Sequence, residues 1–523
     1  MSYKSKNIAG HLAYVFLNNP LTMILAVSIL LLGYLTLNIA PREEDPQIEV
    51  SGGSIIVVIP GASPEAITNV IIKPLERRIR EIKGVEHIYG TAMNNVGMVN
   101  VQYLIGENRE DSNLKLYDKV MQNMDNLPRG VQPPLIKPFD IDIDIPVVTI
   151  AFYQKDVTHP NTVKQYRLVR EIQQEINAIE NVSKSTLKGI NQPQFNIQVD
   201  LDKLSAYHLS LGQITQSVQA IANNAPNIDA PSDNASIIVF GVQNSIEDIN
   251  DLSNLIVAQY QGSPIYLKNV ANIEYSYDIQ HFQKSQLSKK DDESTFDDPI
   301  QQVTLTVSKL KGTNAVHIAE NVLDKLKEKN AVLDETGIGY IVTRNYGNRA
   351  DEAVNELIHH LVITIAIIGL ILVPFLGWRE SLVVSIAVPM ILATTLFLAY
   401  MTDQTINRIT LFAFLLSLGL IVDDAIIVIE NIHRRMHLKE SAEQSFDEII
   451  IEATDEIGPS TNIATIAIIL TMVPMAFVGG MMGQFMKPIP LNVPVALAVS
   501  LFVAYVFTPY LAKKMIKRAK GTH

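Results

Sequence analysis

Residues 411–431, LFAFLLSLGLIVDDAIIVIEN, are the stretch that decides the fold. The run is long enough for one helical membrane crossing, which takes about 20 mostly apolar residues. Asp423 and Asp424 nevertheless stand side by side in its middle. Each costs roughly 2.5–3.5 kcal/mol at the centre of a membrane helix, so the pair indicates a functional role. Neighbouring helix positions point about 100° apart, so we expect the two carboxylates to face different neighbours.

Further apolar runs on either side of this segment predict a bundle of six transmembrane helices. Charged residues make up 18% of the chain, below the roughly 25% of soluble chains. The predicted spans are 21–40, 357–377, 381–401, 409–430, 459–478 and 491–512. A signal peptide is the alternative for 21–40, but that run is longer than a typical signal core. For any one run a buried helix of a soluble protein is the alternative, and five in succession argue against it.

The distribution of Lys and Arg in the short segments predicts the orientation of the spans. With the N-terminus inside, the outer loops carry only Arg408 and Lys487. The inner segments then carry Lys4, Lys6, Arg379, Arg434, Arg435, Lys439, Lys513, Lys514, Lys517, Arg518 and Lys520. We therefore expect a cytoplasmic N-terminus at 1–20, a cytoplasmic loop or amphipathic helix at 431–458 and a cytoplasmic tail at 513–523. Residues 41–356 are expected to lie outside.

Composition excludes several other classes of protein. The formal charge of −12 argues against a nucleic-acid-binding surface. The chain has no Cys, which excludes a disulfide scaffold, a thiolate nucleophile and a Cys zinc site. The outer region has no Gly-rich phosphate loop, HExxH or GxSxG motif, so an enzyme is the weakest interpretation and no metal site is predicted.

The outer region alternates strand and helix patterns in the order β-α-β-β-α-β. This order predicts a split βαβ, ferredoxin-like unit, and hence an α+β domain. The first predicted unit has strands at 54–59, 86–89, 98–104 and 146–153 and helices at 64–82 and 113–124. A second copy is predicted from 146, with a helix at 161–179, strands at 182–188 and 194–200, a helix at 211–223, a strand at 302–309 and a helix at 313–329. Residues 224–285 are predicted to be an inserted subdomain, and 284–299 an exposed loop.

The acidic pair predicts a proton-coupling site, because carboxylates inside the membrane mark ion and proton pathways. A buried acidic pair requires a cation, yet the cores of the other five spans contain no Lys or Arg. His359 and His360 open the second span and are expected to be interfacial. We therefore predict that a second chain, or another copy of this one, supplies the counter-charge. The alternatives are that the pair caps a helix break in a protein-lined pocket, or that the segment does not span.

Glu430 is a third candidate site residue. It lies seven residues after Asp423, about 10 Å further along the same helix face. This position suits a cytoplasmic proton exit, while an ordinary interfacial carboxylate is the simpler alternative.

Several short motifs resemble the resistance-nodulation-division transporters, the proton-driven efflux pumps of Gram-negative inner membranes. They are PREEDP at 41–46, PGASPE at 60–65, PLE at 74–76, LP at 127–128, and GLIVDDAI at 419–426 followed by Glu430-Asn431. The last of these resembles the family's fourth helix. With one helix, a large outer domain and five helices, the resemblance covers nearly the whole chain.

The resemblance implies an architecture beyond what composition gives. Members are usually about twice this long, with two six-helix repeats, and form trimers that act with a periplasmic adaptor and an outer-membrane channel. It implies porter subdomains at 41–145 and at 146–190 with 275–335, and a docking subdomain at 190–275. Asp423 and Asp424 match the proton relay, whose Lys and Arg partners lie in the second repeat. The expectation is a natural half-transporter or a truncated copy, and the basic ending 513–520 favours the former.

The expected function is proton/substrate antiport in the bacterial inner membrane, driven by the proton-motive force. No cofactor is expected beyond protons as the coupling ion, and the membrane lipid is a partner. The resemblance favours amphiphilic substrates, because adjacent aspartates are typical of the multidrug branch. Few Met residues argue against copper or silver; those of the outer domain are Met93, Met98, Met121 and Met124. The alternatives are a lipid or metal exporter of the same type and a non-transporting membrane assembly subunit.

Overall fold

The structure is a computed structural model of the whole chain. It describes residues 6–48, 50–124, 131–140, 144–156, 161–189, 192–222, 228–231, 237–240, 246, 248–277, 285–288, 290, 298–438 and 444–516. The Leu-Pro motif at 127–128 lies outside these residues, as do most of the predicted loop 284–299 and of the predicted tail 513–523. The same holds for Lys4 and Lys439.

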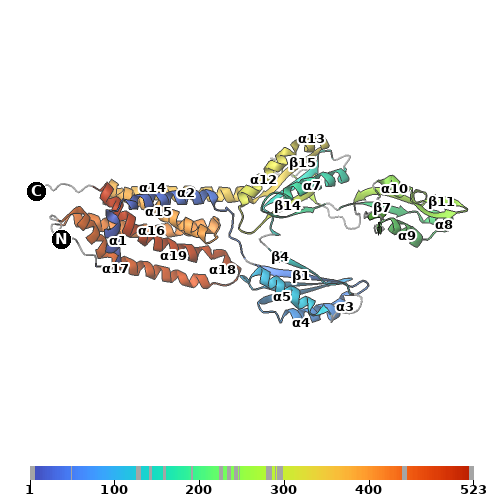
Figure 1. Cartoon of the computed structure of the whole chain (residues 1–523), viewed down its shortest axis with the longest axis horizontal. Helices are drawn as coiled ribbons and strands as arrows, with labels where there is room; N and C mark the ends of the chain where they lie inside the picture. Colours follow the sequence, from blue (N-terminus) through green and yellow to red (C-terminus); the bar gives the residue numbers. More distant parts are fainter. Residues whose placement is uncertain are drawn as a thin grey trace.

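Among the residues that the structure describes, six helices are long and apolar enough to cross a membrane, which is the number expected from the sequence. They are α2 (Leu21–Ile39), α14 (Tyr346–Leu376), α15 (Trp378–Met401), α16 (Arg408–Met436), α17 (Phe446–Met472) and α19 (Pro488–Met515). A 3₁₀ helix, η4 (Val473–Phe477), extends α17, and the short α18 (Gly480–Met486) precedes α19. These helices form a bundle at one end of the molecule, and the sheets lie at the other end (Figure 1). We call the sheet-bearing side of the bundle its domain end and the opposite side its terminal end.

The first soluble subdomain is a four-stranded antiparallel sheet in the order β2-β3-β1-β4. Its strands are β1 (Ser51–Val58), β2 (Val85–Met93), β3 (Val96–Tyr103) and β4 (Leu135–Asp140). Its helices are α3 (Pro64–Ile67), α4 (Lys73–Ile79), joined to α3 by a π-helical turn, and α5 (Arg109–Met121). Alternate residues of β1 and β3 are buried under these helices, Ile55 and Val101 among them. The prediction that 146–153 closes this unit is wrong, since β4 closes it.

The second soluble subdomain has strands in the order β6-β14-β5-β15, with the short β13 (Gln286–Leu287) also paired to β14. Its strands are β5 (Val148–Gln154), β6 (Val182–Lys188), β14 (Ile300–Lys309) and β15 (Ile338–Asn345). Its helices are α7 (Thr162–Asn177), α12 (Ala315–Glu328) and α13 (Asn330–Thr336). The strand β15 lies beyond the predicted boundary at 335. Sequence patterns missed it because its continuation into α14 hides where the soluble region ends.

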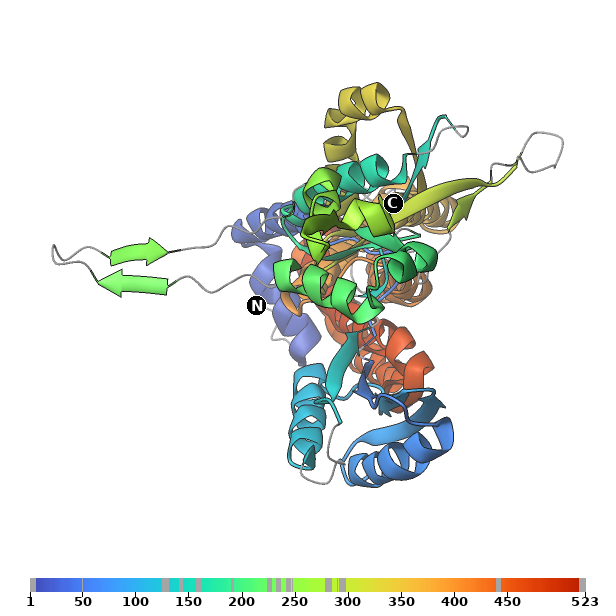
Figure 2. The same ribbon diagram turned by 90° about the vertical axis from the view of Figure 1, so that its right-hand side faces the viewer.

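Two strands that extend from the second soluble subdomain carry the inserted subdomain. The strand β7 (Pro193–Val199), which we expected inside the second sheet, pairs with β12 (Ala271–Tyr277) instead. The remaining elements are α8 (Leu201–Ala206), α9 (Leu211–Ala222), α10 (Ile249–Ser253), α11 (Leu267–Val270), β10 (Ile256–Tyr260) and β11 (Ser263–Tyr266). A hairpin of β8 (Ile228–Pro231) and β9 (Ile237–Phe240) projects sideways, away from the rest of the chain (Figure 2).

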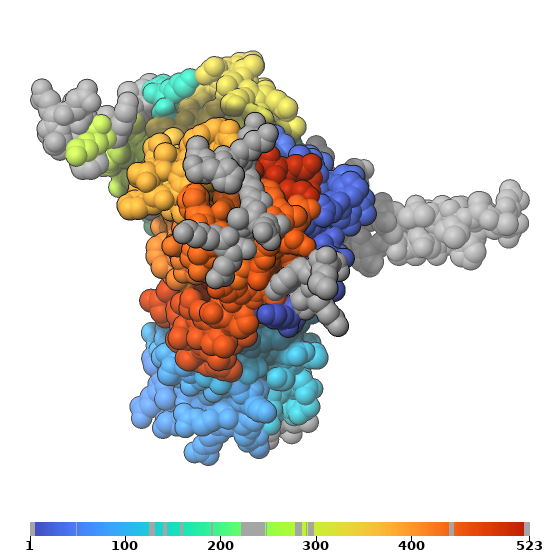
Figure 3. All heavy atoms as spheres, turned by 90° about the vertical axis from the view of Figure 1, so that its left-hand side faces the viewer, coloured from blue at the N-terminus to red at the C-terminus, as the bar shows by residue number. Residues whose placement is uncertain are grey.

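The first and second subdomains lie on opposite sides of the bundle axis (Figures 2 and 3). Each is joined to the bundle by a different helix. The chain enters the first subdomain from α2 and leaves the second through α14, whose first residue follows β15 directly. A displacement of one subdomain relative to the other therefore changes how α2 and α14 are held.

The terminal end is closed by α1 (Ile8–Leu17), a helix within the predicted N-terminal segment 1–20. The buried Asp455 of α17 holds its start, because the Asp455 carboxylate accepts hydrogen bonds from the backbone amides of Lys6 and Asn7. The Asn7 side chain donates to the carbonyl of Asp455. The end of α1 is also tied down, since Asn18 and Lys513 both bond to Asp447.

The predicted cytoplasmic stretch 431–458 is not a separate amphipathic helix. In the described residues it consists of the last turns of α16 and the first turns of α17. Ser445 caps α17 in a reciprocal arrangement with Glu448, which fixes where that helix begins.

The core of the second subdomain provides a direct test of its packing. Leu305 of β14 is fully buried, whereas Leu310, just past the end of the same strand, is 44% exposed. Leu305→Ala should destabilise the sheet by about 2–5 kcal/mol, because the cavity adds to the lost transfer energy. Leu310→Ala should change it by less than about 0.5 kcal/mol. Hydrogen exchange of the β5 and β14 amides in the full chain measures both, and equal effects of the two substitutions would show that this core is misassigned.

Candidate functional site

The helix α16 carries the acidic pair through the centre of the bundle. Asn407 caps its domain end, where the side chain accepts hydrogen bonds from the amides of Ile409 and Thr410. Along α16, apolar residues such as Ile421, Val422 and Ala425 are buried against neighbouring helices. The pair therefore lies at mid-height of a packed helix, with the two carboxylates on different faces.

Asp424 points into the bundle and is only 6% exposed. The Ser500 hydroxyl of α19 lies 2.7 Å from Asp424 Oδ2, and the Thr465 hydroxyl of α17 lies 3.4 Å from Oδ1. Both partners are hydroxyls, which can donate a hydrogen bond to a carboxylate or accept one from a carboxylic acid. The site therefore suits either protonation state of Asp424.

A second contact of Ser500 shows how the site accommodates both protonation states of Asp424. Its oxygen is also 2.8 Å from the carbonyl oxygen of Ile421, one turn before the pair. A serine hydroxyl has a single proton, so it can donate to Asp424 or to Ile421 but not to both at full strength. When Asp424 is ionised the proton is best placed toward the carboxylate. When Asp424 is protonated it can donate to Ser500, which then donates to Ile421.

Asp423 lies on a different, uncovered face of α16 and is exposed. It belongs to a row of exposed residues whose first four members are spaced by four, three and four positions, with the fifth seven positions further on. The row consists of Phe412, Leu416, Gly419, Asp423 and Glu430. Nothing lies within 4 Å of where a Cβ on Gly419 would be, so the helix backbone itself is accessible there. We call this row the open seam; its alternating spacing of four and three is the spacing of a helix that packs against another helix.

Glu430 closes the open seam toward the terminal end and is exposed. Within the part of the chain that the structure describes, no Lys, Arg or His pairs with Asp423, Asp424 or Glu430. His359 and His360, predicted to be interfacial, lie in α14 away from the pair; His360 is 3.7 Å from Glu356 of its own helix. The structure thus brings Asp424 together with Ser500 and Thr465, but leaves Glu430 apart from them.

Sequence reasoning missed the partners of Asp424. Ser500 and Thr465 are single hydroxyl residues inside the apolar runs 491–512 and 459–478, and such residues are common in membrane helices. Tyr505 and Asn462 also meet in this region, where the Tyr505 hydroxyl lies 2.9 Å from Asn462 Oδ1. The sequence offered no signal that separates these residues from hydroxyls that bond within their own helix.

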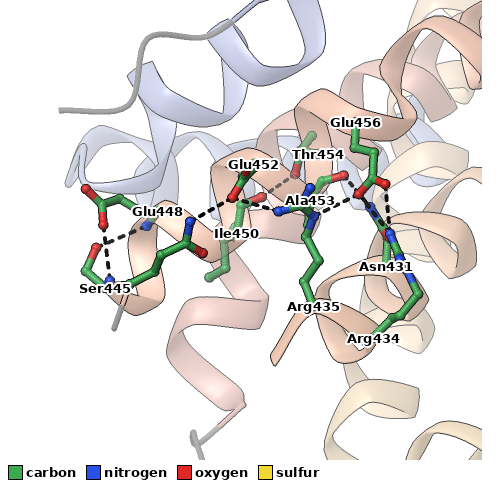
Figure 4. A network of polar contacts seen from close by, with 11 residues as sticks. Asn431, Arg434, Arg435, Ser445, Glu448, Ile450, Glu452, Ala453, Thr454 and Glu456 are labelled. Carbon is green, nitrogen blue, oxygen red and sulfur yellow. Dashed lines mark hydrogen bonds and ion pairs between the residues drawn. The ribbon is translucent and has the colours of Figure 1, made fainter. Parts of the chain in front are cut away.

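A charged network ties α16 to α17 at the terminal end (Figure 4). Arg434 bonds both oxygens of Glu456 at 2.8 and 2.9 Å, and Arg435 bonds Glu456 and Glu452 at 2.7 Å. Asn431 donates to Glu456 and to the carbonyl of Ala453. Several charge-assisted hydrogen bonds from two Arg residues thus converge on Glu456 and restrict its position. The network holds the terminal half of α16 against α17, the helix that contributes Thr465.

The sequence comparison identifies the protein family. A sequence model described as the AcrB/AcrD/AcrF family matches residues 12–523. The chain belongs to that family. It is thus a member of the resistance-nodulation-division transporters, and the resemblance predicted from the motifs is confirmed. Members of the AcrB/AcrD/AcrF family are multi-pass inner-membrane transporters rather than enzymes, in agreement with the six apolar helices.

A cavity of about 830 Å³ in this AcrB/AcrD/AcrF family member opens at the domain end, beside the start of α16. Its apolar wall comes from α15 and α19 and includes Leu398, Met401, Leu491 and Val495. Polar groups, Gln404 and Asn492 among them, also line the cavity. A cavity lined by both apolar and polar groups suits an amphiphilic molecule.

The hydroxyl contact to Asp424 can be tested by substitution. Ser500→Ala should destabilise the α16–α19 contact by about 1.5–3 kcal/mol, the usual loss for a hydrogen bond to a charged group. Ser417→Ala is the matched control, because that buried hydroxyl bonds only to Phe414 of its own helix. Thermal unfolding of the purified full chain in detergent compares them.

The pairing is confirmed if Ser500→Ala costs much less in an Asp424→Asn background, since the two effects then share one interaction. Equal costs for Ser500→Ala and Ser417→Ala, or strict additivity with Asp424→Asn, would rule it out.

Proposed function

We propose that this chain is one half of a proton-driven exporter of amphiphilic compounds, working by proton/substrate antiport. One observation carries the proposal: two adjacent carboxylates at mid-height of α16, Asp424 among exchangeable hydroxyls and Asp423 on an open face. A carboxylate is retained inside an apolar bundle at a large free-energy cost, and proton relays are the usual reason. The environment of Asp424 supports this role, because it accommodates both the ionised and the protonated form.

The proposed mechanism uses protonation as the switch. Ionised Asp423 would hold a cation of the facing helix, and protonation would release it, so that helices move relative to each other. Proton entry down a membrane potential supplies about 2.3 kcal/mol per 100 mV. In this proposal both chain termini are cytoplasmic, the sheets are periplasmic, and Glu430 is a possible exit for the proton. A trimer, an adaptor and an outer-membrane channel complete the assembly.

The open seam supports the half-transporter part of the proposal. Phe412 and Leu416 are each 48% exposed, and Gly419 leaves room for close approach of a second helix. Small residues at such positions allow helix backbones to pack closely in membranes. A helix seated on this seam would bring its side chains directly over Asp423. We infer that a Lys or Arg of a second half, or of a second copy, lies there.

The cavity at the domain end favours amphiphiles over metal ions as cargo. Its lining includes only two acidic side chains, Glu43 and Asp403, and among the described residues no three His, Cys, Asp or Glu are grouped as metal ligands would be. A lipid exporter remains the second candidate, because a lipid is also an amphiphile. Accumulation of envelope lipids in a deletion strain with unchanged drug sensitivity would favour it. A non-transporting assembly subunit predicts no proton flux in liposomes, with or without the partner.

The proton relay is tested by removing one carboxylate at a time. Asp423→Asn or Asp424→Asn should reduce proton-dependent ethidium efflux from cells to background, because neither amide can take up and release the proton. Glu356→Gln is the control, since Glu356 is an exposed carboxylate of α14. Expression is compared by blot. Efflux that continues unchanged in both aspartate variants would contradict the proposal.

Cross-linking tests the open seam. Because the chain has no Cys, an introduced Cys is its only thiol. Leu416→Cys labelled with a benzophenone maleimide should form a photo-cross-linked product in native membranes, because a second helix covers that position. Val362→Cys on α14, which is 60% exposed, serves as the control and should remain uncrosslinked. A product from Val362→Cys alone would place the partner on a different face.

A further inference from the structure

Residues 41–47 (PREEDPQ) join α2 to the first subdomain. They also contact the start of α16 and the second subdomain. We call this segment the strap. Its backbone runs beside the loop before α16: Pro41 O accepts from Ile406 N at 2.8 Å, and Glu43 N donates to Ile406 O at 3.0 Å. Arg408, the first residue of α16, donates its amide to Glu44 O at 3.1 Å. The strap is therefore bonded to the domain end of the helix that carries the acidic pair.

The strap is also bonded to the second soluble subdomain. Ala315, the first residue of α12, donates its amide to Arg42 O at 3.0 Å, and Gly312 N donates to the Gln47 side chain at 3.0 Å. Three parts of the molecule that are distant in sequence thus meet at one short segment: α2, the start of α16 and the base of the second subdomain.

Glu43 is the centre of this junction. Its carboxylate accepts from Lys309 at the end of β14, from Thr405 in the loop before α16 at 2.9 Å, and from Gln47 at 2.7 Å. The side chains of Glu43 and Lys309 are only 4% and 8% exposed. One buried carboxylate therefore links the end of β14, an inner strand of the second sheet, to the loop that leads into α16.

The neighbouring Glu44 differs from Glu43 in a way that makes it a natural comparison. It pairs with Arg408 at 2.6 Å and Arg349 at 3.5 Å, and these two Arg side chains are 47% and 65% exposed. Glu44 itself is 14% exposed, but water and salt reach both of its pairs through the exposed Arg side chains, so these pairs are replaced at lower cost than a fully buried one. A buried pair cannot be exchanged in this way, because breaking it leaves an uncompensated charge away from water.

We propose that Glu43 is the positioning residue that transmits displacement of α16 to the second soluble subdomain. This inference rests on the proposed function. A helix is stiff along its axis, and Asp424 lies roughly 24 Å from Arg408 at 1.5 Å per residue. A shift of α16 caused by a change in the acidic pair therefore reaches its capped domain end. There Thr405, Glu43 and Lys309 carry it to β14, which is bonded to both β5 and β6.

Buried ion pairs are weak evidence for stability, because apolar side chains of similar size often replace them without loss. A purely structural role is the simpler alternative, and it makes a different prediction. If Glu43 only holds the fold, substitution lowers stability but leaves the response of the outer region to the acidic pair intact. If Glu43 transmits displacement, that response disappears.

The experiment measures this response on the purified full chain. Spin labels are attached at Lys327→Cys on α12 and at Leu491→Cys in the first turn of α19, both on a chain that has no other Cys. Electron–electron resonance then gives the distance distribution with Asp424 present and with Asp424→Asn as the permanently uncharged form. With Glu43 intact, Asp424→Asn should shift the distribution. With Glu43→Gln the shift should vanish, and with Glu44→Gln it should persist.

Thr405→Val is the second variant, in case Glu43→Gln does not fold. It removes the side-chain link from Glu43 to the α16 loop and leaves the Glu43–Lys309 pair and the backbone bonds of the strap in place, so the shift should again be lost. A full-size shift in Glu43→Gln or in Thr405→Val, or no shift with Glu43 and Thr405 intact, overturns the inference. The readout does not depend on transport. Absence of ethidium efflux by the unmodified protein would therefore count against the proposed function, while the distance response still decides the role of Glu43.

Discussion

A carboxylate inside an apolar helix bundle is the constraint on which the rest of the structure depends. Asp424 is kept from water on all sides, and its ionised form is tolerable only because hydroxyl groups face it. That requirement places α19 and α17 beside α16, with Ser500 and Thr465 at the same height. The surrounding apolar residues pack the three helices together, and the polar contacts determine which helix faces lie against each other.

The second constraint is that the bundle and the sheets must meet without leaving buried charges unpaired. Glu43 and Lys309 satisfy each other at this boundary, and Thr405 occupies the remaining oxygen. The two soluble subdomains are attached to the bundle at separate places, through α2 and α14. The strap joins the end of α2, the start of α16 and the base of the second subdomain. Its geometry therefore determines how the soluble region is positioned on the membrane helices.

The sequence was most informative where a physical requirement repeats over many residues. Twenty apolar residues in a row predict a span, and the adjacent aspartates point to the helix that carries the candidate site. Strand pairing depends on contacts between distant segments. Pro146–Tyr153 was therefore counted as the last strand of the first unit as well as the start of the second, while β4 and β15 were missed. Ser500 and Thr465 could not be found from sequence, because a single hydroxyl in an apolar run looks the same whether it faces a carboxylate or its own helix. The role of Glu43 could not be predicted either, since nothing in PREEDP indicates that the first glutamate pairs with a buried Lys and the second with exposed Arg side chains.

The docking of α1 has a cause that lies in another helix. Pro459 sits inside α17 and has no amide hydrogen, so the carbonyl of Asp455, one turn earlier, lacks the donor that an unbroken helix would supply. The Asn7 side chain provides it, while the Asp455 carboxylate caps the start of α1. The helix α1 is thus bound at the point where Pro459 interrupts the hydrogen bonding of α17, the fifth membrane helix. Any bend of α17 at this proline displaces the acceptor that holds α1, and the N-terminal helix follows the hinge.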